Sequence, residues 1–455
     1  MKYIAQKRSS NLNSWIGELP DGWCVKRLKY VSSINDETLP ENTQADYEML
    51  YVDIGSVDAT EGIQKKEPII FESAPSRARR IVQDGDTIVS TVRTYLRAVA
   101  TIENPKKNLI VSTGFAIVRP KGINPHYLAY CLRSSYFIET VVSRSVGVSY
   151  PATNPTDVSC IEVPLPSIKE QQTIARFLDA KTAQIDNLIA KKRQLIDKLN
   201  EKRSALIART VTRGLPPEAA KAAGLEANPK MKDSGGAWFG LIPSHWDCKP
   251  IKHVAQIGNG STPARDNPDY WEYGEIPWLN SSVVNAGEVL LSDQFVTGAA
   301  LRQCHLPIVK PPAVLVGITG EGRTRGMAAI LLIEATINQH VAYVKPRDAL
   351  ADVRYLWRIF QFAYSFLRSE SEGGGSTKGA ITCDQIANLK IPLPSVPEQR
   401  AIASYLDCEA KKIDKLVAKA FIAIARLTEY RQALITSAVT GKIDVRETPT
   451  LPEAA

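Results

Sequence analysis

The chain has 455 residues, which is too long for one ordinary hydrophobic core and predicts two or three domains. Apolar residues make up 44% and charged residues 23%, as is typical of a soluble globular protein, and no apolar run approaches the length of a membrane span. The first residues lack the apolar segment of a signal peptide. The net charge of +8 suits a polyanionic partner without establishing one.

Cysteine and histidine are scattered along the chain. The seven cysteines are odd in number and unclustered, which argues for a reducing cytoplasm and against a disulfide framework or a thiolate zinc site. The five histidines show no metal-ligand spacing. We therefore expect a cytoplasmic protein without a metal centre and without a membrane partner.

The first predicted element is an opening motif, SWIGELPDGWCVKRLKYV, at residues 14–31. It recurs 223 residues later as AWFGLIPSHWDCKPIKHV at residues 237–254. A second phrase, VPLPSIKEQQTIARFLD at residues 163–179, recurs 228 residues later as IPLPSVPEQRAIASYLD at residues 391–407. Because the two spacings nearly agree, the chain consists of two similar halves.

A mixed body follows each opening motif. Short β-branched runs such as DTIVSTV, LIVSTGFAIV, AVLVGIT and HVAYVKP are bounded by Gly, Pro and Asn and predict strands. HYLAYCLRSSYFIETVV and VRYLWRIFQFAYSFLRS carry apolar residues at steps of three and four and predict helices. The fold class expected for each body is α+β.

A long helix follows the PLPS phrase in each half. Glu170-Gln171 and Glu398-Gln399 open its first turn, where acidic charge suits the helix dipole. Apolar residues then recur in the a/d pattern of a coiled coil, so the two helices can bury each other. Each would be about 35 residues and roughly 50 Å long. This stripe comprises Ile185, Leu188, Leu195, Leu199 and Leu206 in the first helix and Ile413, Leu416, Leu427 and Leu434 in the second.

A stretch rich in Pro, Ala, Gly and Lys follows the first helix and reads as a linker. It would let the second body reach the far end of the first helix, so that the helices run antiparallel and hold the bodies apart. The predicted boundaries are 1–165 for the first body, 166–214 for the first helix, 215–237 for the linker, 238–393 for the second body, 394–441 for the second helix and 442–455 for a tail.

Two phrases suggest catalysis, but a simpler interpretation is favoured for both. Asn267-Pro-Asp-Tyr270 resembles the Asn-Pro-Pro-Tyr/Phe motif of adenine methyltransferases, yet Asp269 replaces a proline and no apolar strand precedes it, which favours a surface turn. VGITGEGRTRG at residues 316–326 lacks the Lys-Ser/Thr of a P-loop and favours a tight turn that carries arginines. We expect a chain that binds rather than reacts, with no catalytic residue.

Arginines that suit binding of phosphates and base edges are concentrated in the first body and dispersed through the second. For each single arginine a solvated face or a salt bridge is an equal alternative. One small-residue loop lies before the PLPS phrase in both halves, at residues 143–151 and 371–379, where backbone could approach a ligand closely. The candidate DNA-contacting residues are Arg77, Arg79, Arg80, Arg93, Tyr95, Arg97, Arg144, Ser149, Tyr150, Arg265, Arg323, Arg325, Ser376, Thr377 and Lys378.

The order of opening motif, variable body and PLPS-x-x-EQ helix, repeated twice, resembles the specificity subunit of type I restriction-modification systems. KDSGGAWFGLIPSHW, GNGSTPARDNPDYWEYGEIPWLN, INQHVAYVKP and VSTGFAIVRPK are similar to phrases of that family. The resemblance covers nearly the whole chain. It also explains Asn267 to Tyr270 as part of a recognition body and not as a methyltransferase site.

The resemblance implies a non-catalytic subunit that serves DNA methylation and restriction. Each body would be a target recognition domain that reads one half of an asymmetric bipartite site in double-stranded DNA. The helices, including Glu170, Gln171, Glu398 and Gln399, would set the spacer and dock two methyltransferase subunits, and two restriction/translocase subunits would complete the enzyme. S-adenosylmethionine, ATP and Mg²⁺ would belong to those partners, and this chain would bind no cofactor. A coiled-coil scaffold without DNA readout and a stand-alone methyltransferase are the alternatives.

Overall fold

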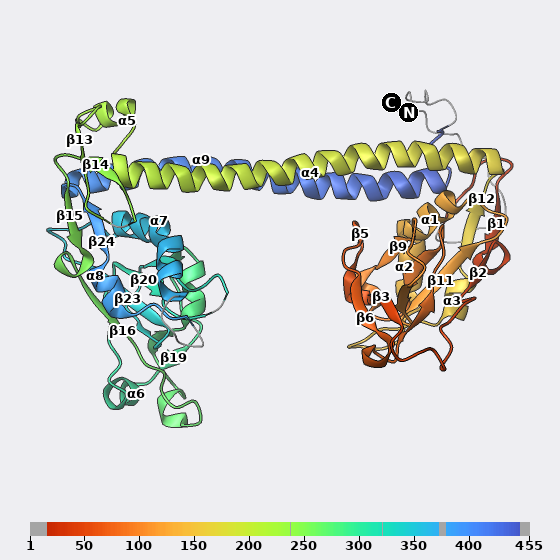
Figure 1. Cartoon of the computed structure of the whole chain (residues 1–455), viewed down its shortest axis with the longest axis horizontal. Helices are drawn as coiled ribbons and strands as arrows, with labels where there is room; N and C mark the ends of the chain where they lie inside the picture. Colours follow the sequence, from red (N-terminus) through yellow and green to blue (C-terminus); the bar gives the residue numbers. More distant parts are fainter. Residues whose placement is uncertain (1–15, 237, 321, 373–378, 446–455) are drawn as a thin grey trace. The chain divides into compact units, whose positions relative to one another are not determined.

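The computed structural model describes residues 16–236, 238–320, 322–372 and 379–445. The chain divides into two compact units. The first unit contains the residues up to Arg193 and those from Ala420 onward, and the second contains Gln194 to Lys419. The two long helices, α4 (Ile168–Arg213) and α9 (Val396–Val439), each contribute one part to each unit (Figure 1).

The first unit contains two four-stranded sheets, in the orders β6-β3-β10-β7 and β2-β11-β8-β9. All their pairs are antiparallel except β10 with β3. Strands β8 and β10 are buried at every position, which explains why they read as continuous runs without a polar alternation. The strands are β1 (Cys24–Arg27), β2 (Ser32–Ile34), β3 (Glu48–Val52), β4 (Val57–Asp58), β5 (Gly62–Ile63), β6 (Glu67–Ile70), β7 (Ala78–Ile81), β8 (Thr87–Ser90), β9 (Val99–Thr101), β10 (Leu109–Ser112), β11 (Phe115–Pro120) and β12 (Glu162–Leu165).

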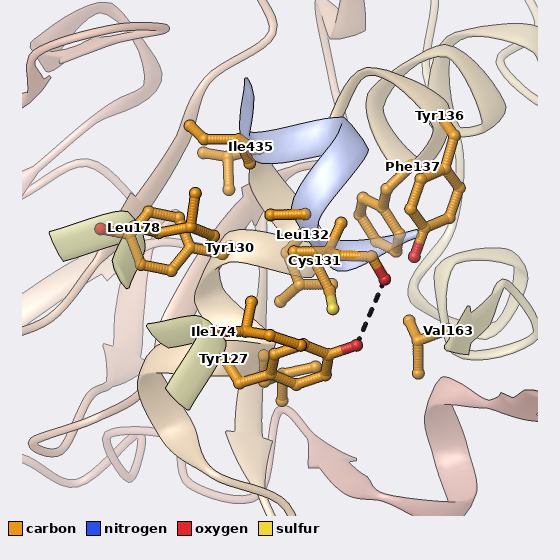
Figure 2. Packing of buried hydrophobic residues seen from close by; sticks show 14 of the residues in the cluster. Tyr127, Tyr130, Cys131, Leu132, Tyr136, Phe137, Val163, Ile174, Leu178 and Ile435 are labelled. Atoms are coloured by element: carbon orange, nitrogen blue, oxygen red, sulfur yellow. Dashed lines mark hydrogen bonds between the residues drawn. The ribbon is translucent and has the colours of Figure 1, made fainter. Parts of the chain in front are cut away.

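The main core of the first unit joins its body to both long helices. Helices α1 (Pro125–Arg133) and α2 (Ser135–Ser143) supply Tyr127, Leu132 and Phe137, and the short α3 (Pro155–Ser159) supplies Val158. Leu178 of α4 and residues near the end of α9, including Ile435, complete the cluster (Figure 2). The start of α4 thus packs beside the end of α9 in this unit.

The second unit contains a five-stranded sheet, β16-β23-β20-β21-β18, and a three-stranded sheet, β19-β17-β22. Its core holds Trp246, Tyr355 and Phe360 together with Ile402 and Leu406 of α9. Its further elements are α5 (Pro217–Ala222), β13 (Met231–Asp233), β14 (Leu241–Pro243), β15 (Asp247–Pro250), β16 (Ala255–Asn259), β17 (Ile276–Leu279), β18 (Glu288–Val289), β19 (Phe295–Val296), α6 (Gly298–Gln303), β20 (Ala313–Gly317), β21 (Ala328–Leu331), β22 (Thr336–Ile337), β23 (Val341–Pro346), α7 (Val353–Glu372), α8 (Cys383–Asn388) and β24 (Lys390–Leu393).

The two sequence repeats meet in each unit. Strand β1 of the opening motif pairs with β12 of the PLPS phrase, with Cys24 opposite Leu165. In the second unit β15 pairs with β24 in the same way, with Asp247 opposite Leu393. The expectation of two similar α+β bodies with two long helices is therefore confirmed.

The PLPS-x-x-EQ phrase fastens the start of each long helix to its own body. Gln171 is buried, accepts a hydrogen bond from Asn124 N at 2.9 Å and donates to Pro166 O at 2.9 Å. Gln399 is also buried, accepts from Asp352 N at 2.8 Å and donates to the carbonyls of Leu350 and Pro394 at 3.1 and 2.9 Å. The side-chain amides of both glutamines make their hydrogen bonds inside their own unit. This corrects the expectation that these glutamines face a partner.

The glutamates of the phrase are also engaged locally. Glu398 is buried and accepts from Trp246 Nε1 at 3.0 Å, and its other oxygen lies 3.1 Å from His245 Nε2. Glu170 accepts from the backbone and hydroxyl of Ser167 at 3.1 and 2.8 Å, as a residue of a helix cap does. The near-identity of the two phrases thus reflects a repeated internal joint.

Within each unit the two helices run antiparallel and share a buried stripe. Ile185, Leu199, Ile413 and Leu434 are buried as expected, and Leu206 and Leu427 are partly buried against the cores. The expectation that Leu188, Leu195 and Leu416 are buried is wrong, because all three are more than 40% exposed. From Ile185 onward, a helix of 3.6 residues per turn drifts away from a strict seven-residue stripe. The buried apolar positions of this part of α4 are Ile185, Ile189, Ile196, Leu199, Ile207 and Val211.

The segment expected to be a linker, 215–237, is structured over most of its length. It carries α5 and β13, and β13 pairs with β14. Leu215 and Ala220 lie in the core of the second unit, so most of this segment belongs to that unit. Among the described residues no helix has the length and apolar content needed to cross a bilayer.

Candidate nucleic-acid interface

Three segments of the first unit meet at one end of β8 and β11. The segment after β8 donates from Thr91 N to Gly114 O, in the turn between β10 and β11, at 2.8 Å. The segment after α2 donates from Thr153 N to Thr91 O at 2.8 Å. We call this meeting point of three segments the loop junction.

The second unit builds an equivalent loop junction. Gly317 stands opposite Val341 in the β20–β23 pair, as Ser90 stands opposite Phe115 in the first unit. Ile318 N donates to His340 O at 3.0 Å, and Ile381 N donates to Ile318 O at 2.8 Å. The same three segments therefore meet in both units, although the side chains that they carry differ.

Arginine and tyrosine are exposed at the loop junction of the first unit. Arg93 and Arg97 flank one turn of helix with positive φ values of 51° and 55°, which turns the short segment outward. Tyr95 and Tyr150 are exposed, and the Arg93 guanidinium lies 5.1 Å from the centre of the Tyr150 ring. Arg97 instead pairs with Glu139 at 2.6 Å. Four predicted residues are thus brought together.

The neighbouring predicted residues divide between the junction and other contacts. Ser149 lies beside Tyr150 in the exposed segment. Arg77 is exposed, and its carbonyl accepts from Thr113 N at 2.8 Å, so it adjoins the same turn. Arg144 donates to Asp157 O at 2.8 Å and is tied to α3.

Arg79 and Arg80 are engaged within their own sheet and its surroundings. Arg79 lies over the Phe71 ring at 4.4 Å. Arg80 donates to Thr38 Oγ1 at 3.0 Å, and burial lowers the pKa of its guanidinium. These two side chains stabilise the edge of the sheet and are less available to a ligand than Arg77 and Arg93.

The predicted arginines of the second unit lie in three different environments. Arg265 lies 4.0 and 4.8 Å from the ring centres of Trp271 and Trp278 and donates to Gln294 Oε1 at 2.9 Å. Arg323 is exposed. Arg325 is only 4% exposed and pairs with Glu372 at 2.9 Å, so the prediction of a ligand contact is corrected to a structural role. Ser376, Thr377 and Lys378 lie outside the described residues.

Both phrases with a catalytic appearance form turns. The Asn267 side chain accepts from Asp269 N at 3.0 Å, caps a short helical turn and is thereby held in place. The Gly-rich segment after β20 is held by α7, where the hydroxyl of Tyr364 donates to Arg323 O at 3.0 Å and Arg368 donates to Gly322 O at 2.6 Å. Over the described part of the chain, no group of three His, Cys, Asp or Glu side chains could hold a metal ion.

Three polar residues at the second loop junction were not singled out from the sequence. Thr262, Gln339 and His340 form one hydrogen-bonded group with Thr319. Their position along the chain could have pointed to them. Gln339-His340 directly precede β23, just as Thr113-Gly114 precede the equivalent strand β11. Only the pairing of the strands makes that equivalence visible.

Comparison with known proteins identifies the architecture. The profile of the family "Type I restriction modification DNA specificity domain" matches residues 20–200 and 243–416. The chain is 25% identical to a putative type I restriction enzyme MjaX specificity subunit of Methanocaldococcus jannaschii, over 95% of this chain and 96% of that protein. It is 24% identical to the EcoKI specificity subunit of Escherichia coli K12, over 94% and 90% of the two chains.

Solved structures share the fold. A chain from a study of complex assembly and conformational transition of the type I R-M system aligns with a TM-score of 0.68 at 23% identity, over 94% of this chain and all of that one. The HsdS subunit from Thermoanaerobacter tengcongensis aligns with a TM-score of 0.50 at 24% identity, over 94% and 98%. The matched relatives are named specificity subunits of type I restriction enzymes, in agreement with the resemblance found in the sequence. Since the family profile matches well over half of its length, the chain belongs to the family of type I restriction modification DNA specificity domains.

Proposed function

We propose that this chain recognises double-stranded DNA as the specificity subunit of a type I restriction-modification enzyme. Each unit reads one half of an asymmetric bipartite site through its loop junction. The observation that carries this proposal is that the two units repeat the same three-segment junction with different side chains. Repetition of the frame with variation of the contacts is what two different half-sites require.

The chemistry of the first junction supports contact with DNA. Arg93, Tyr95 and Tyr150 are exposed together, and Arg77 adjoins the turn between β10 and β11 that belongs to the same junction. Arginine binds phosphates and guanine edges, while the net charge of +8 favours approach to a polyanion. Because Arg77 and Arg93 lie on exposed segments, their side chains can reach phosphates and base edges of a duplex.

The long helices support the proposed spacing role. Helices α4 and α9 contain 46 and 44 residues, more than expected from the stripe, because they begin directly after the PLPS phrase. At 1.5 Å per residue they are about 69 and 66 Å long, which exceeds the 34–36 Å of one duplex turn. We infer that their length sets the spacer between half-sites.

Docking of two methyltransferase subunits is proposed on equivalent exposed leucines. Leu188 and Leu416 are related by the repeat spacing of 228 and are 47% and 49% exposed, one in each unit. Two identical partners require two such equal surfaces. Two restriction/translocase subunits would complete the enzyme, and S-adenosylmethionine, ATP and Mg²⁺ would be bound by the partners while this chain binds no cofactor.

Mapping of methylated bases tests the proposal. The chain is produced together with the methyltransferase subunits of its own system in a host without other methylation, and the genome is sequenced for modified bases. A bipartite motif is the expected result. Absence of any motif in the presence of an assembled complex would contradict it and favour a scaffold without DNA readout.

A further inference from the structure

A chain of hydrogen bonds holds the exposed amide of Gln339 at the second loop junction. Thr262 Oγ1 donates to Gln339 Oε1 at 2.5 Å. Gln339 Nε2 lies 3.2 Å from His340 Nε2, and His340 Nδ1 lies 2.8 Å from Thr319 Oγ1. Gln339 itself is exposed, while the other three side chains are half-buried beneath it.

The directions of these bonds follow from the chemistry of the groups. An amide nitrogen can only donate, so the Gln339 amide donates toward His340 Nε2. The other ring nitrogen, His340 Nδ1, shares a hydrogen bond with Thr319 Oγ1. The hydroxyl of Thr262 donates to Gln339 Oε1, and the amide nitrogen of Gln339 lies on the side of His340.

The backbone beneath this group is closely packed. A side chain on Gly260 would meet Ile337 O at 1.7 Å, so the segment that carries Thr262 lies directly against the strand before Gln339. Ser261 N donates to Ile337 O at 3.1 Å, and His340 N donates to Asn338 Oδ1 at 3.0 Å. These contacts therefore fix the position of the turn that carries Gln339.

One donor and one acceptor of the Gln339 amide remain open to solvent. Oxygen has a second lone pair and nitrogen has a second hydrogen after the bonds to Thr262 and His340 are made. Adenine presents the complementary pair in the major groove, an acceptor at N7 and a donor at N6, whereas guanine presents two acceptors. We propose that Gln339 reads an adenine in the half-site of the second unit, with Thr262 and His340 as positioning residues.

This inference rests on the proposed function, since it presumes that the second unit contacts DNA bases. Selection of binders from a library of fully randomised DNA duplexes by the full-length chain tests both. The wild-type chain is expected to enrich a motif with one adenine whose preference depends on Gln339. Gln339→Ala should reduce the preference for that adenine by roughly 5- to 150-fold and leave the other positions unchanged.

Two further variants separate reading from folding. Gln339→Glu keeps the size of the side chain but replaces the donor with an acceptor, so it should lose the adenine and favour cytosine, whose N4 donates. Thr262→Val frees the amide to turn over and should weaken the adenine preference without loss of the remaining motif. Gln256→Ala, at an exposed glutamine on β16, is the matched control and should change no position.

The outcomes distinguish the two claims. If the wild-type chain enriches no motif, the proposed function fails, and the role of Gln339 fails with it. If the wild-type chain enriches a motif that Gln339→Ala and Gln339→Glu leave unchanged, the role of Gln339 is wrong while the proposed function stands. A change confined to a guanine or cytosine position would overturn the assignment of adenine.

Discussion

Arg431 of α9 and Asp186 of α4 form an ion pair, with Arg431 Nε 2.9 Å from Asp186 Oδ1. Arg203 of α4 and Asp414 of α9 form its counterpart in the second unit, with the roles of the helices exchanged. Both partners of the second pair are displaced by the repeat spacing of 228 residues. Each unit thus fixes its helix register by the same contact.

Loss of the first pair should destabilise the chain more than loss of the second. The Arg431 side chain is 8% exposed, whereas that of Arg203 is 33% exposed and more strongly screened by water. We expect Arg431→Ala to lower the free energy of unfolding by about 1–2 kcal/mol. Urea denaturation should show a smaller change for Arg203→Ala, and an equal or larger one would contradict this ranking.

Removal of the Gln399 amide should loosen the joint between the second body and α9. Gln399→Ala leaves the part-buried Asp352 N–H without its acceptor and two carbonyls without their donor, at a cost of about 2–4 kcal/mol. Gln171→Ala should cost less because it breaks fewer bonds. Thermal unfolding measures both variants, and Arg400→Ala, at the exposed neighbouring position, should cost less than about 1 kcal/mol.

Substitution of either exposed leucine should remove one partner subunit. Leu188→Asp or Leu416→Asp introduces a charge on a surface that we propose to be covered by a methyltransferase subunit. Native mass spectrometry of the co-produced complex should show one methyltransferase subunit in place of two, with unfolding unchanged because both positions are exposed. Leu241→Asp, at another exposed leucine on β14, should leave both partners bound. Two retained partners in both leucine variants would refute the docking surface.

Substitutions at the first loop junction should affect one half-site only. Arg93→Ala or Tyr150→Ala is expected to weaken DNA binding by about 1–3 kcal/mol and to relax the half-site read by the first unit. Methylation mapping should show the other half-site unchanged. Lys107→Ala removes an exposed cation of the same unit away from the junction and should change neither half-site. Relaxation of both half-sites by Arg93→Ala would show that the units do not read independently.

The Cys131 thiol should resist modification in the folded chain. Burial raises its pKa from 9.0 to about 12, so between these values the folded chain keeps a proton that the unfolded chain releases. Stability from this group is therefore present below about pH 9 and is lost as the pH rises toward 12. Iodoacetamide at about pH 9 should label the exposed Cys24 and Cys408 and label Cys131 only after denaturation, as peptide mass spectrometry can show. Equal labelling rates for Cys131 and Cys408 would contradict this.

Local patterns carried much of the architecture. The duplicated phrases predicted two halves, and the apolar steps after PLPS predicted both long helices, because these features depend on spacing along one segment. The predicted burial of single helix positions was wrong where it depends on packing against a second element. Ile189 lies beside Leu188 on α4, and only packing against α9 and the body selects Ile189 for the interior.

The residues of the candidate site were also only partly predictable from the sequence. Composition pointed to Arg93, Tyr95 and Tyr150, but it equally pointed to Arg325, whose guanidinium is buried against Glu372. Gln339 and Thr262 are separated by 77 residues, and nothing in either local sequence shows that their side chains meet. The sequence by itself determined the repeat, the fold class and the family resemblance, since each is written in contiguous residues. The tertiary structure alone decided that the amides of Gln171 and Gln399 bond inside the fold while that of Gln339 stays exposed. The reason is that these hydrogen bonds join segments far apart in the chain.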